Sequence, residues 1–143
     1  METVIVDAGP LVAYLRADDA DHAWVAERFR EFREPLLTCD AVLSEAFFLL
    51  RGISSGRLKL LGLLDRGIVV PAFDLGSEIS AVGKLMLRYE NVPMSLADAC
   101  LVRMAEVHSD PRVFTLDADF HVYRRNRRGT IPLIFPGASL PTE

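Results

Sequence analysis

Four carboxylates in four separate segments are the residues of this chain whose types and positions suggest chemistry. Asp7 and Asp117 each follow directly on a short apolar run that contains β-branched residues, and Glu45 and Asp98 each stand among apolar neighbours. An ionised carboxylate in apolar surroundings is costly unless it is paired or coordinated. Four carboxylates about 5 Å apart repel by roughly 3 kcal/mol per pair at an effective dielectric constant of about 20. Brought together by the fold, they must bind a cation or hold protons.

A hard divalent cation is the partner that such a group favours. Carboxylate oxygens suit Mg²⁺ or Mn²⁺, and no Cys or His residue has the spacing of a zinc site. The three histidines, His22, His108 and His121, are scattered along the chain. Asp119 follows Asp117 by two residues and is a possible fifth ligand. The chemistry that such a site predicts is hydrolysis of a phosphodiester bond by a metal-activated water.

A basic run lies a few residues after these last acids. Arg124, Arg125, Arg127 and Arg128 fall within five positions. The net charge is −4, but setting the five acids named above apart from the total of 20 leaves 15 acids against 16 bases. This distribution suits a scaffold with one acidic site and one basic loop that holds backbone phosphates. The alternative is that the arginines form a solvated surface loop.

Short parallel strands are the elements that would position the first and last of the carboxylates. Val and Ile without polar alternation favour strands that are covered on both faces. Open parallel sheets place their ligands at the carboxyl ends of the strands, where Asp7 and Asp117 fall. If their strands are neighbours, the two strand ends lie about 5 Å apart. The predicted strands cover residues 3–6, 35–38, 68–73, 111–116 and 131–135.

Helices would position the other two carboxylates. Residues 41–50 predict a helix that is apolar nearly all round and therefore buried, with Glu45 as its only charge. Ser95 caps a helix that runs to about His108, with Asp98 at the capping-box position. In the alternatives, Glu45 pairs with an arginine or faces solvent, and Asp98 only binds backbone amides. Further helices are predicted over residues 11–16, from about 21 to 33, and over 58–64 and 74–90.

Length and composition indicate one domain over residues 1–143 with a sizeable core. Half of the residues are apolar, which leaves apolar side chains for a protein interface. No apolar stretch approaches the length of a membrane span and no targeting segment precedes the first strand, so we expect a cytoplasmic protein. Cys39 and Cys100 lack metal-ligand spacing and are interpreted as reduced structural thiols.

Four acidic motifs, one around each of the four carboxylates and in the same order along the chain, give it a resemblance to the PIN-domain ribonucleases and, most closely, to VapC-type toxins. The resemblance covers nearly the whole chain. Asp-His-Ala-Trp at 21–24 and Tyr-Arg-Arg at 123–125 also look VapC-like. The motifs are Val-Asp-Ala-Gly-Pro-Leu-Val-Ala at 6–13, Leu-Ser-Glu-Ala at 43–46, Ser-Leu-Ala-Asp-Ala at 95–99 and Phe-Thr-Leu-Asp-Ala-Asp-Phe at 114–120.

This resemblance implies a three-layer PIN-like α/β fold with a parallel sheet of four to five strands flanked by helices. It also implies a homodimer with Mg²⁺- or Mn²⁺-dependent endoribonuclease activity, RNA as the substrate and a VapB-type antitoxin as the partner. The implied catalytic and metal-binding residues are Asp7, Glu45, Asp98 and Asp117, with Asp119 as a possible further metal ligand.

One position departs from the family pattern. Many PIN domains carry Thr or Ser after the first aspartate, whereas this chain has Ala8 and then Gly9. Ser44, Ser95 and Thr115 are the remaining candidates to orient the carboxylates.

Two other functions are considered. The first alternative is a catalytically silent PIN-fold interaction module, in which the acids are vestigial and the apolar helices bind a partner. An Asp-based phosphatase or receiver domain fits poorly, because Lys59 and Lys84 fall in predicted helices far from the acidic motifs.

Overall fold

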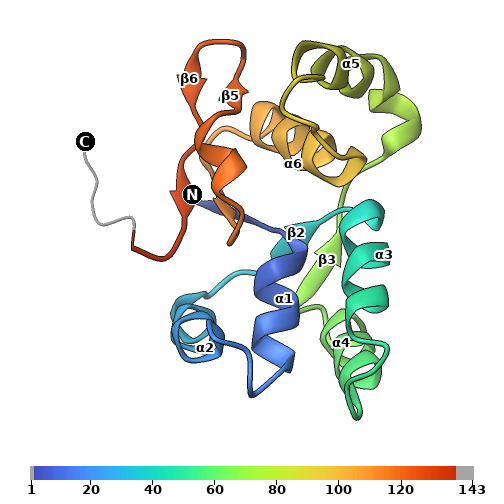
Figure 1. Ribbon diagram of the computed structural model, residues 1–143, viewed down its shortest axis with the longest axis vertical. Coiled ribbons are helices and arrows are strands. Elements are labelled where there is room, and N and C mark those ends of the chain that lie inside the picture. Colours follow the sequence, from blue (N-terminus) through green and yellow to red (C-terminus); the bar gives the residue numbers. More distant parts are fainter. Residues whose placement is uncertain (1, 138–143) are drawn as a thin grey trace.

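The computed structural model describes residues 2–137, in which five short strands form one parallel sheet with helices on both sides (Figure 1). The strand order is β3-β2-β1-β4-β7, and every pairing is parallel. This confirms the predicted α/β fold. The prediction of one domain over 1–143 includes Met1 and residues 138–143, which lie outside the described residues. The strands are β1 (Thr3–Val6), β2 (Leu36–Thr38), β3 (Val69–Pro71), β4 (Pro111–Phe114) and β7 (Leu133–Ile134).

The strand β1 occupies the centre of the sheet and pairs with β2 on one side and β4 on the other. Val6 lies opposite Phe114 in the register, so the two strands end side by side. Ile5, Val6, Val113 and Phe114 are fully buried, as expected for strands covered on both faces. The strands before Asp7 and Asp117 are therefore parallel neighbours, which is the condition under which the sequence placed the two acids side by side.

Six α-helices within the described residues complete the layers. Figure 1 shows α5 and α6 on one side of the sheet, with α1, α2 and α4 on the other. The helix α3 contacts both α1 and α6 and so connects the two groups. The helices are α1 (Ala8–Leu15), α2 (His22–Glu31), α3 (Asp40–Leu49), α4 (Gly56–Asp65), α5 (Leu75–Arg88) and α6 (Leu96–Val107).

Side-chain caps determine where the helices of the site begin. The carboxylate of Asp7 accepts the backbone N–H of Ala8, so α1 begins immediately after β1, earlier than the predicted residue 11. In α6 the predicted capping box is confirmed. The Ser95 hydroxyl accepts the Asp98 N–H, and the Asp98 carboxylate accepts the Ser95 N–H.

The basic segment is ordered rather than an open loop, which corrects the sequence prediction. A 3-10 helix η1 (Ala118–His121) follows β4, and β5 (Arg124–Arg125) and β6 (Gly129–Thr130) then form an antiparallel hairpin. We call β5, β6 and their connecting turn the arginine hairpin. Asn126 and Arg127 in its turn have φ values of 52° and 72°.

The helix α3 is not buried all round, contrary to the prediction from its composition. Val42 and Ala46 are buried, but Phe48 is 60% and Leu49 43% exposed. The helix packs against α1 and α6, and the Arg51 guanidinium lies over the exposed Phe48 ring, 3.8 Å from its centroid. None of the helices in the described part of the chain is long and apolar enough to cross a bilayer.

Candidate active site

The five predicted acids line one cleft of about 440 Å³ at the carboxyl end of the central strands. We call it the acidic cleft. The structure therefore brings together side chains from four distant segments of the chain, as the sequence predicted. Its lining comprises Asp7, Gly9, Glu45, Pro93, Ser95, Asp98, Leu116, Asp117 and Asp119.

Each acid reaches the acidic cleft from the beginning or the body of a helix. Asp7 ends β1 and caps α1, and Asp117 follows β4 and caps η1. Asp98 lies in the first turn of α6, and Glu45 lies within α3. Because β1 and β4 are parallel neighbours, the first two acids leave the sheet at the same edge.

Asp7 is the most enclosed of the five acids, with 8% of its surface exposed. Its Oδ1 accepts the Ala8 N–H at 2.7 Å, and its Oδ2 accepts the Thr115 hydroxyl at 2.7 Å. Burial nevertheless raises the pKa of Asp7 from 3.8 to about 6, and the charges of Asp98 and Glu45 add to the rise. Burial therefore destabilises the Asp7 carboxylate more than its two hydrogen bonds stabilise it.

Thr115 ties the ends of the two central strands together. Its hydroxyl donates to Asp7 and accepts the Asp117 backbone N–H at 2.9 Å. This contact explains how the site orients Asp7 without a hydroxyl residue at position 8. Of the three hydroxyl residues considered from sequence, Thr115 and Ser95 contact site acids, whereas Ser44 is exposed with no such hydrogen bond among the described residues.

Asp98 is held by a buried tyrosine that sequence analysis did not assign to the site. The Tyr123 hydroxyl donates to Asp98 Oδ2 at 2.9 Å, and the Ser95 N–H reaches the same oxygen at 3.4 Å. Within residues 2–137 no hydrogen bond reaches Oδ1, which stays available to a ligand. Burial, the largest cause, and the Asp117 charge raise the pKa of Asp98.

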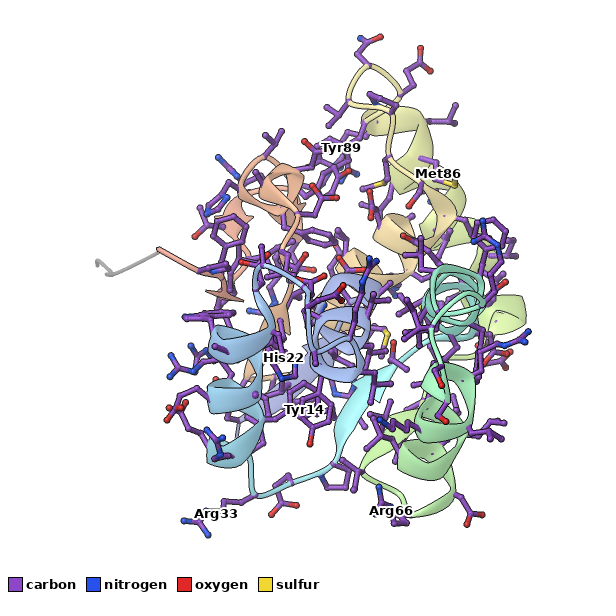
Figure 2. All side chains as sticks on the ribbon, turned by 60° about the horizontal axis from the view of Figure 1, so that its bottom comes forward. Tyr14, His22, Arg33, Arg66, Met86 and Tyr89 are labelled. Carbon is purple, nitrogen blue, oxygen red and sulfur yellow. The ribbon has the colours of Figure 1, made fainter. Side chains whose placement is uncertain are left out.

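Tyr123 is itself fixed by aromatic neighbours and is fully buried. Its ring meets Phe120 and Tyr89 edge to face, each with centroids 5.1 Å apart. The Tyr89 hydroxyl accepts the backbone N–H of Arg124, which joins the end of α5 to the arginine hairpin. Figure 2 labels Tyr89 beside the C-terminal part of the chain. The Tyr-Arg-Arg motif at 123–125 was the only signal in the sequence for this tyrosine.

Glu45 lies at the open side of the acidic cleft rather than in the buried setting that its helix predicted. The residue is exposed, although it lines the cleft. Partial desolvation raises its pKa, with smaller contributions from the charges of Asp98 and Asp117. No arginine or lysine pairs with Glu45 among the described residues. The alternative in which Glu45 pairs with an arginine is therefore wrong for the described residues.

Asp117 and Asp119 form a local turn at the rim of the acidic cleft. The Asp117 Oδ1 accepts the Asp119 N–H at 2.9 Å, which caps η1. Neither carboxylate makes an ion pair within the described part of the chain. Asp119 is exposed and is the last of the five acids in the sequence.

The donor set of the acidic cleft fits a divalent cation that keeps part of its water shell. The donors are carboxylate oxygens, and no side-chain cation of residues 2–137 forms an ion pair with any of them. As they stand, no three His, Cys, Asp or Glu side chains among residues 2–137 are close enough to hold one metal ion directly. Mg²⁺ is commonly held by one or two carboxylates, with waters and substrate phosphates as the remaining ligands. Because that binding mode needs only one or two carboxylates, it does not require three ligand side chains to lie close together.

The four predicted RNA-binding arginines divide into two pairs. Arg124 donates to the carbonyls of three preceding residues, and Arg125 donates to the Ala105 and His108 carbonyls at 2.7 and 2.6 Å. Arg127 and Arg128 are exposed. None of the four lines the acidic cleft. Arg124 and Arg125 thus fasten the arginine hairpin to the body of the protein.

The parallel sheet with carboxylates gathered at its carboxyl edge is the arrangement of a PIN domain. The family model described as PIN domain matches residues 4–126, and the chain belongs to this family.

Two mycobacterial proteins are similar to the chain. Ribonuclease VapC26 of Mycobacterium tuberculosis is 27% identical over 117 residues, which are 80% of this chain and 86% of that protein. The crystal structure of Mycobacterium tuberculosis VapC20, described as a sarcin-ricin loop cleaving toxin, superposes with a TM-score of 0.74 at 20% identity. That match covers 84% of this chain and 94% of VapC20 and shows a shared fold. The VapC resemblance of the sequence is confirmed.

Proposed function

We propose that this protein is a metal-dependent endoribonuclease and the toxin of a type II toxin-antitoxin pair. The observation that carries the proposal is the acidic cleft, where five carboxylates meet without a cationic side chain bound to any of them within residues 2–137. Membership of the PIN family and the similarity to Ribonuclease VapC26 support ribonuclease activity.

Asp7 and Asp98 are the residues best placed to hold Mg²⁺ or Mn²⁺. When bound, the metal would activate a water molecule and stabilise the charge that develops at phosphorus and the leaving oxygen. Thr115 fixes Asp7, and Tyr123 fixes Asp98 Oδ2 while Oδ1 remains available. Such outer hydrogen bonds keep ligating carboxylates in one orientation.

The remaining acids complete the site from its open side. Glu45 and Asp117 both line the acidic cleft and contribute further ligand oxygens or orient the attacking water. Asp119 serves as an outer fifth acid. Because these carboxylates are more exposed than Asp7, they can contact water and substrate without a large desolvation cost.

The proposal includes partners for this toxin. We expect RNA as the substrate, a VapB-type antitoxin, a homodimer and a cytoplasmic location. Exposed apolar side chains on α3 and α4, at Phe48, Leu49, Leu58 and Leu61, support protein partners. Light scattering on the purified protein tests the dimer, and a monomeric mass at all concentrations would contradict it.

The decisive experiment is cleavage of total RNA by the purified protein with Mn²⁺ or Mg²⁺, beside Asp98→Asn and an EDTA control. We expect metal-dependent cleavage that Asp98→Asn loses, because the substitution removes a charge and little volume. Asp65→Asn is the matched control, since Asp65 is an exposed acid outside the acidic cleft. Full activity of a folded Asp98→Asn protein would contradict the assignment.

A catalytically silent PIN module is the second candidate. The observation that favours it is the absence, among the described residues, of three ligand side chains close enough to bind one metal ion directly. In this case neither Mn²⁺ nor Mg²⁺ raises the melting temperature, and no RNA is cleaved while partner binding persists.

A further inference from the structure

A second cleft, separate from the acidic one, lies between α5, α6 and the arginine hairpin. Its volume is about 530 Å³, and it shares no lining residue with the acidic cleft. The basic residues of its lining are Lys84 and Arg88 of α5, Arg103 of α6 and Arg127 of the hairpin turn. We call it the basic cleft.

The two acids of the basic cleft, Glu78 and Glu106, share one arginine partner, while four cations line the cleft. Arg103 donates to Glu78 at 2.6 Å and to Glu106 at 3.2 Å. The other Glu106 oxygen accepts the Asn126 backbone N–H at 2.8 Å. One arginine therefore serves both carboxylates, and Lys84, Arg88 and Arg127 are left without an acidic partner among residues 2–137. The cleft has a surplus of positive charge in a protein whose net charge is −4.

The arginine hairpin is fastened so that its turn lines the basic cleft. Arg125 binds two carbonyls at the end of α6, Glu106 holds Asn126, and the Tyr89 hydroxyl accepts the Arg124 N–H. Figure 2 labels Tyr89 beside the C-terminal part of the chain. The turn is thus held at its base and at its tip.

The backbone at Arg127 is strained in a way that glycine would relieve. Its φ is 72°, a conformation that favours glycine, and Arg127 is not a residue that adopts it readily. A side chain kept at such a position often marks a functional constraint. Here the strained residue brings a third cation, with no acidic partner among the described residues, to the wall of the basic cleft.

We propose that the basic cleft binds backbone phosphates of the RNA substrate outside the bond that is cleaved. This inference rests on the proposed ribonuclease function. Five carboxylates in the acidic cleft repel a polyanion, so a separate cationic surface is needed to hold it. The lining offers cations and the hydroxyls of Ser77 and Ser80, which are typical phosphate contacts. An acidic peptide would also want an apolar anchor, but Leu85 in this wall is buried.

The first measurement is binding of a fluorescein-labelled single-stranded RNA of mixed sequence to the protein in EDTA, over a range of salt concentrations. The variants are the pair Lys84→Gln/Arg88→Gln and the single change Arg127→Gly. We expect about tenfold weaker binding when all three cations are removed. The slope of log affinity against log salt should flatten by about 2, because each lost phosphate contact removes about 0.7.

Arg127→Gly separates a ligand contact from a structural role. Glycine suits φ 72°, so the melting temperature should stay unchanged or rise while RNA affinity falls. The pair Arg57→Gln/Lys59→Gln is the matched control, since both are exposed cations of α4 outside the basic cleft. An equal loss of RNA affinity in this control would overturn the proposal. The proposal would also be overturned if RNA affinity stayed the same after all three cations of the cleft had been replaced.

Two further readouts separate this proposal from its alternatives. In cleavage assays with Mn²⁺, removal of the three cations should raise KM for RNA and leave kcat unchanged. Cleavage with native KM in these variants would overturn the basic cleft alone, whereas cation-dependent RNA binding without any cleavage would overturn the nuclease and not the cleft. Poly-glutamate that binds to the cleft cations more tightly than the RNA would identify a site for an acidic protein and overturn the proposal.

Discussion

At the scale of single residues, Asp7 shows how burial and hydrogen bonding compete. Two donors within 2.7 Å support its charge, yet desolvation outweighs them and raises its pKa to about 6. A raised pKa in the folded state means that the folded protein binds the proton more tightly than the unfolded chain does. The contribution of Asp7 to stability is therefore complete below its unfolded pKa of 3.8 and is lost as the pH rises past about 6.

The first prediction concerns Asp7→Asn, which cannot ionise. In EDTA, the free energy of unfolding of the native protein should fall relative to that of Asp7→Asn as the pH rises from about 4 to about 7.5. The pKa rise from 3.8 to about 6 corresponds to about 3 kcal/mol. Urea unfolding at several pH values measures this difference. A difference between the two proteins that does not change with pH would show that Asp7 ionises as easily as in the unfolded chain.

The second prediction concerns Tyr123→Phe, which removes only the hydroxyl that binds Asp98. Without this donor the carboxylate loses its fixed orientation, and Mn²⁺ affinity should fall by about tenfold, as for other outer-sphere partners of metal ligands. Calorimetric titration with Mn²⁺ measures the effect. Tyr14→Phe is the control, because Tyr14 is stacked on Phe29 away from the acidic cleft. Unchanged Mn²⁺ affinity in Tyr123→Phe would refute the positioning role.

The site acids could be predicted from sequence because each is a single charge in an apolar segment or at the end of a strand. Asp7 and Asp117 needed only the rule that parallel strands end at one edge. Tyr123 could not be predicted in the same way, since its partner Asp98 lies 25 residues earlier and the contact depends on how η1 turns. The pattern around Glu45 predicted burial, but a composition does not say which face of a helix the other elements leave open.

At the scale of elements, the helix α6 depends on Ser95 both for its start and for the orientation of Asp98. Our third prediction is that Ser95→Ala lowers the free energy of unfolding by about 1 kcal/mol, the usual contribution of an N-cap. Chemical denaturation measures the change. Ser54→Ala is the control, because Ser54 is exposed and outside any helix cap. If Ser54→Ala lowered the free energy of unfolding by as much, the capping box would not be the cause of the loss in Ser95→Ala.

The arginine hairpin gives a fourth prediction about Arg125. Its two hydrogen bonds to the end of α6 should make Arg125→Gln less stable by about 1 to 3 kcal/mol. Arg128→Gln should leave the melting temperature unchanged, since Arg128 is exposed. If Arg125→Gln instead weakened RNA binding and kept full stability, Arg125 would act on RNA as the sequence first suggested.

This hairpin was not predictable because its strands are two residues long and carry no alternating pattern. Its turn also lacks the glycine that usually announces a backbone with positive φ. Longer elements were predicted well. The strand over Thr3–Val6 matches the expected residues, and the helix Leu96–Val107 starts at its predicted cap.

At the scale of the whole molecule, charge is separated into two clefts on one fold. The acidic cleft gathers uncompensated carboxylates, and the basic cleft gathers cations with few acidic partners. The sequence showed this separation as an acid excess that vanishes once five residues are set aside. It could not show that Lys84 and Arg88 lie beside Arg127, because only the packing of α5 on α6 and the placement of the hairpin bring them together.

The fifth prediction concerns the response of the whole fold to metal. Mn²⁺ at about 100 times its dissociation constant should add about 2.7 kcal/mol to the free energy of unfolding, because it binds the folded chain alone. Differential scanning calorimetry with and without EDTA measures the shift. Asp98→Asn should lose most of it and Asp65→Asn none. A shift of equal size in all three proteins would mean that Mn²⁺ binds elsewhere.

The hydrogen bond between Thr115 and Asp7 joins residues 108 positions apart. A chain still being synthesised has Asp7, Glu45 and Asp98 outside the ribosome before the strand Pro111–Phe114 can pair beside Thr3–Val6. Until then, the strand pairing that brings Asp7 beside Asp117 cannot form. We therefore expect the proposed ribonuclease to stay inactive towards RNA during synthesis, and to gain activity only when nearly the whole chain has emerged and folded.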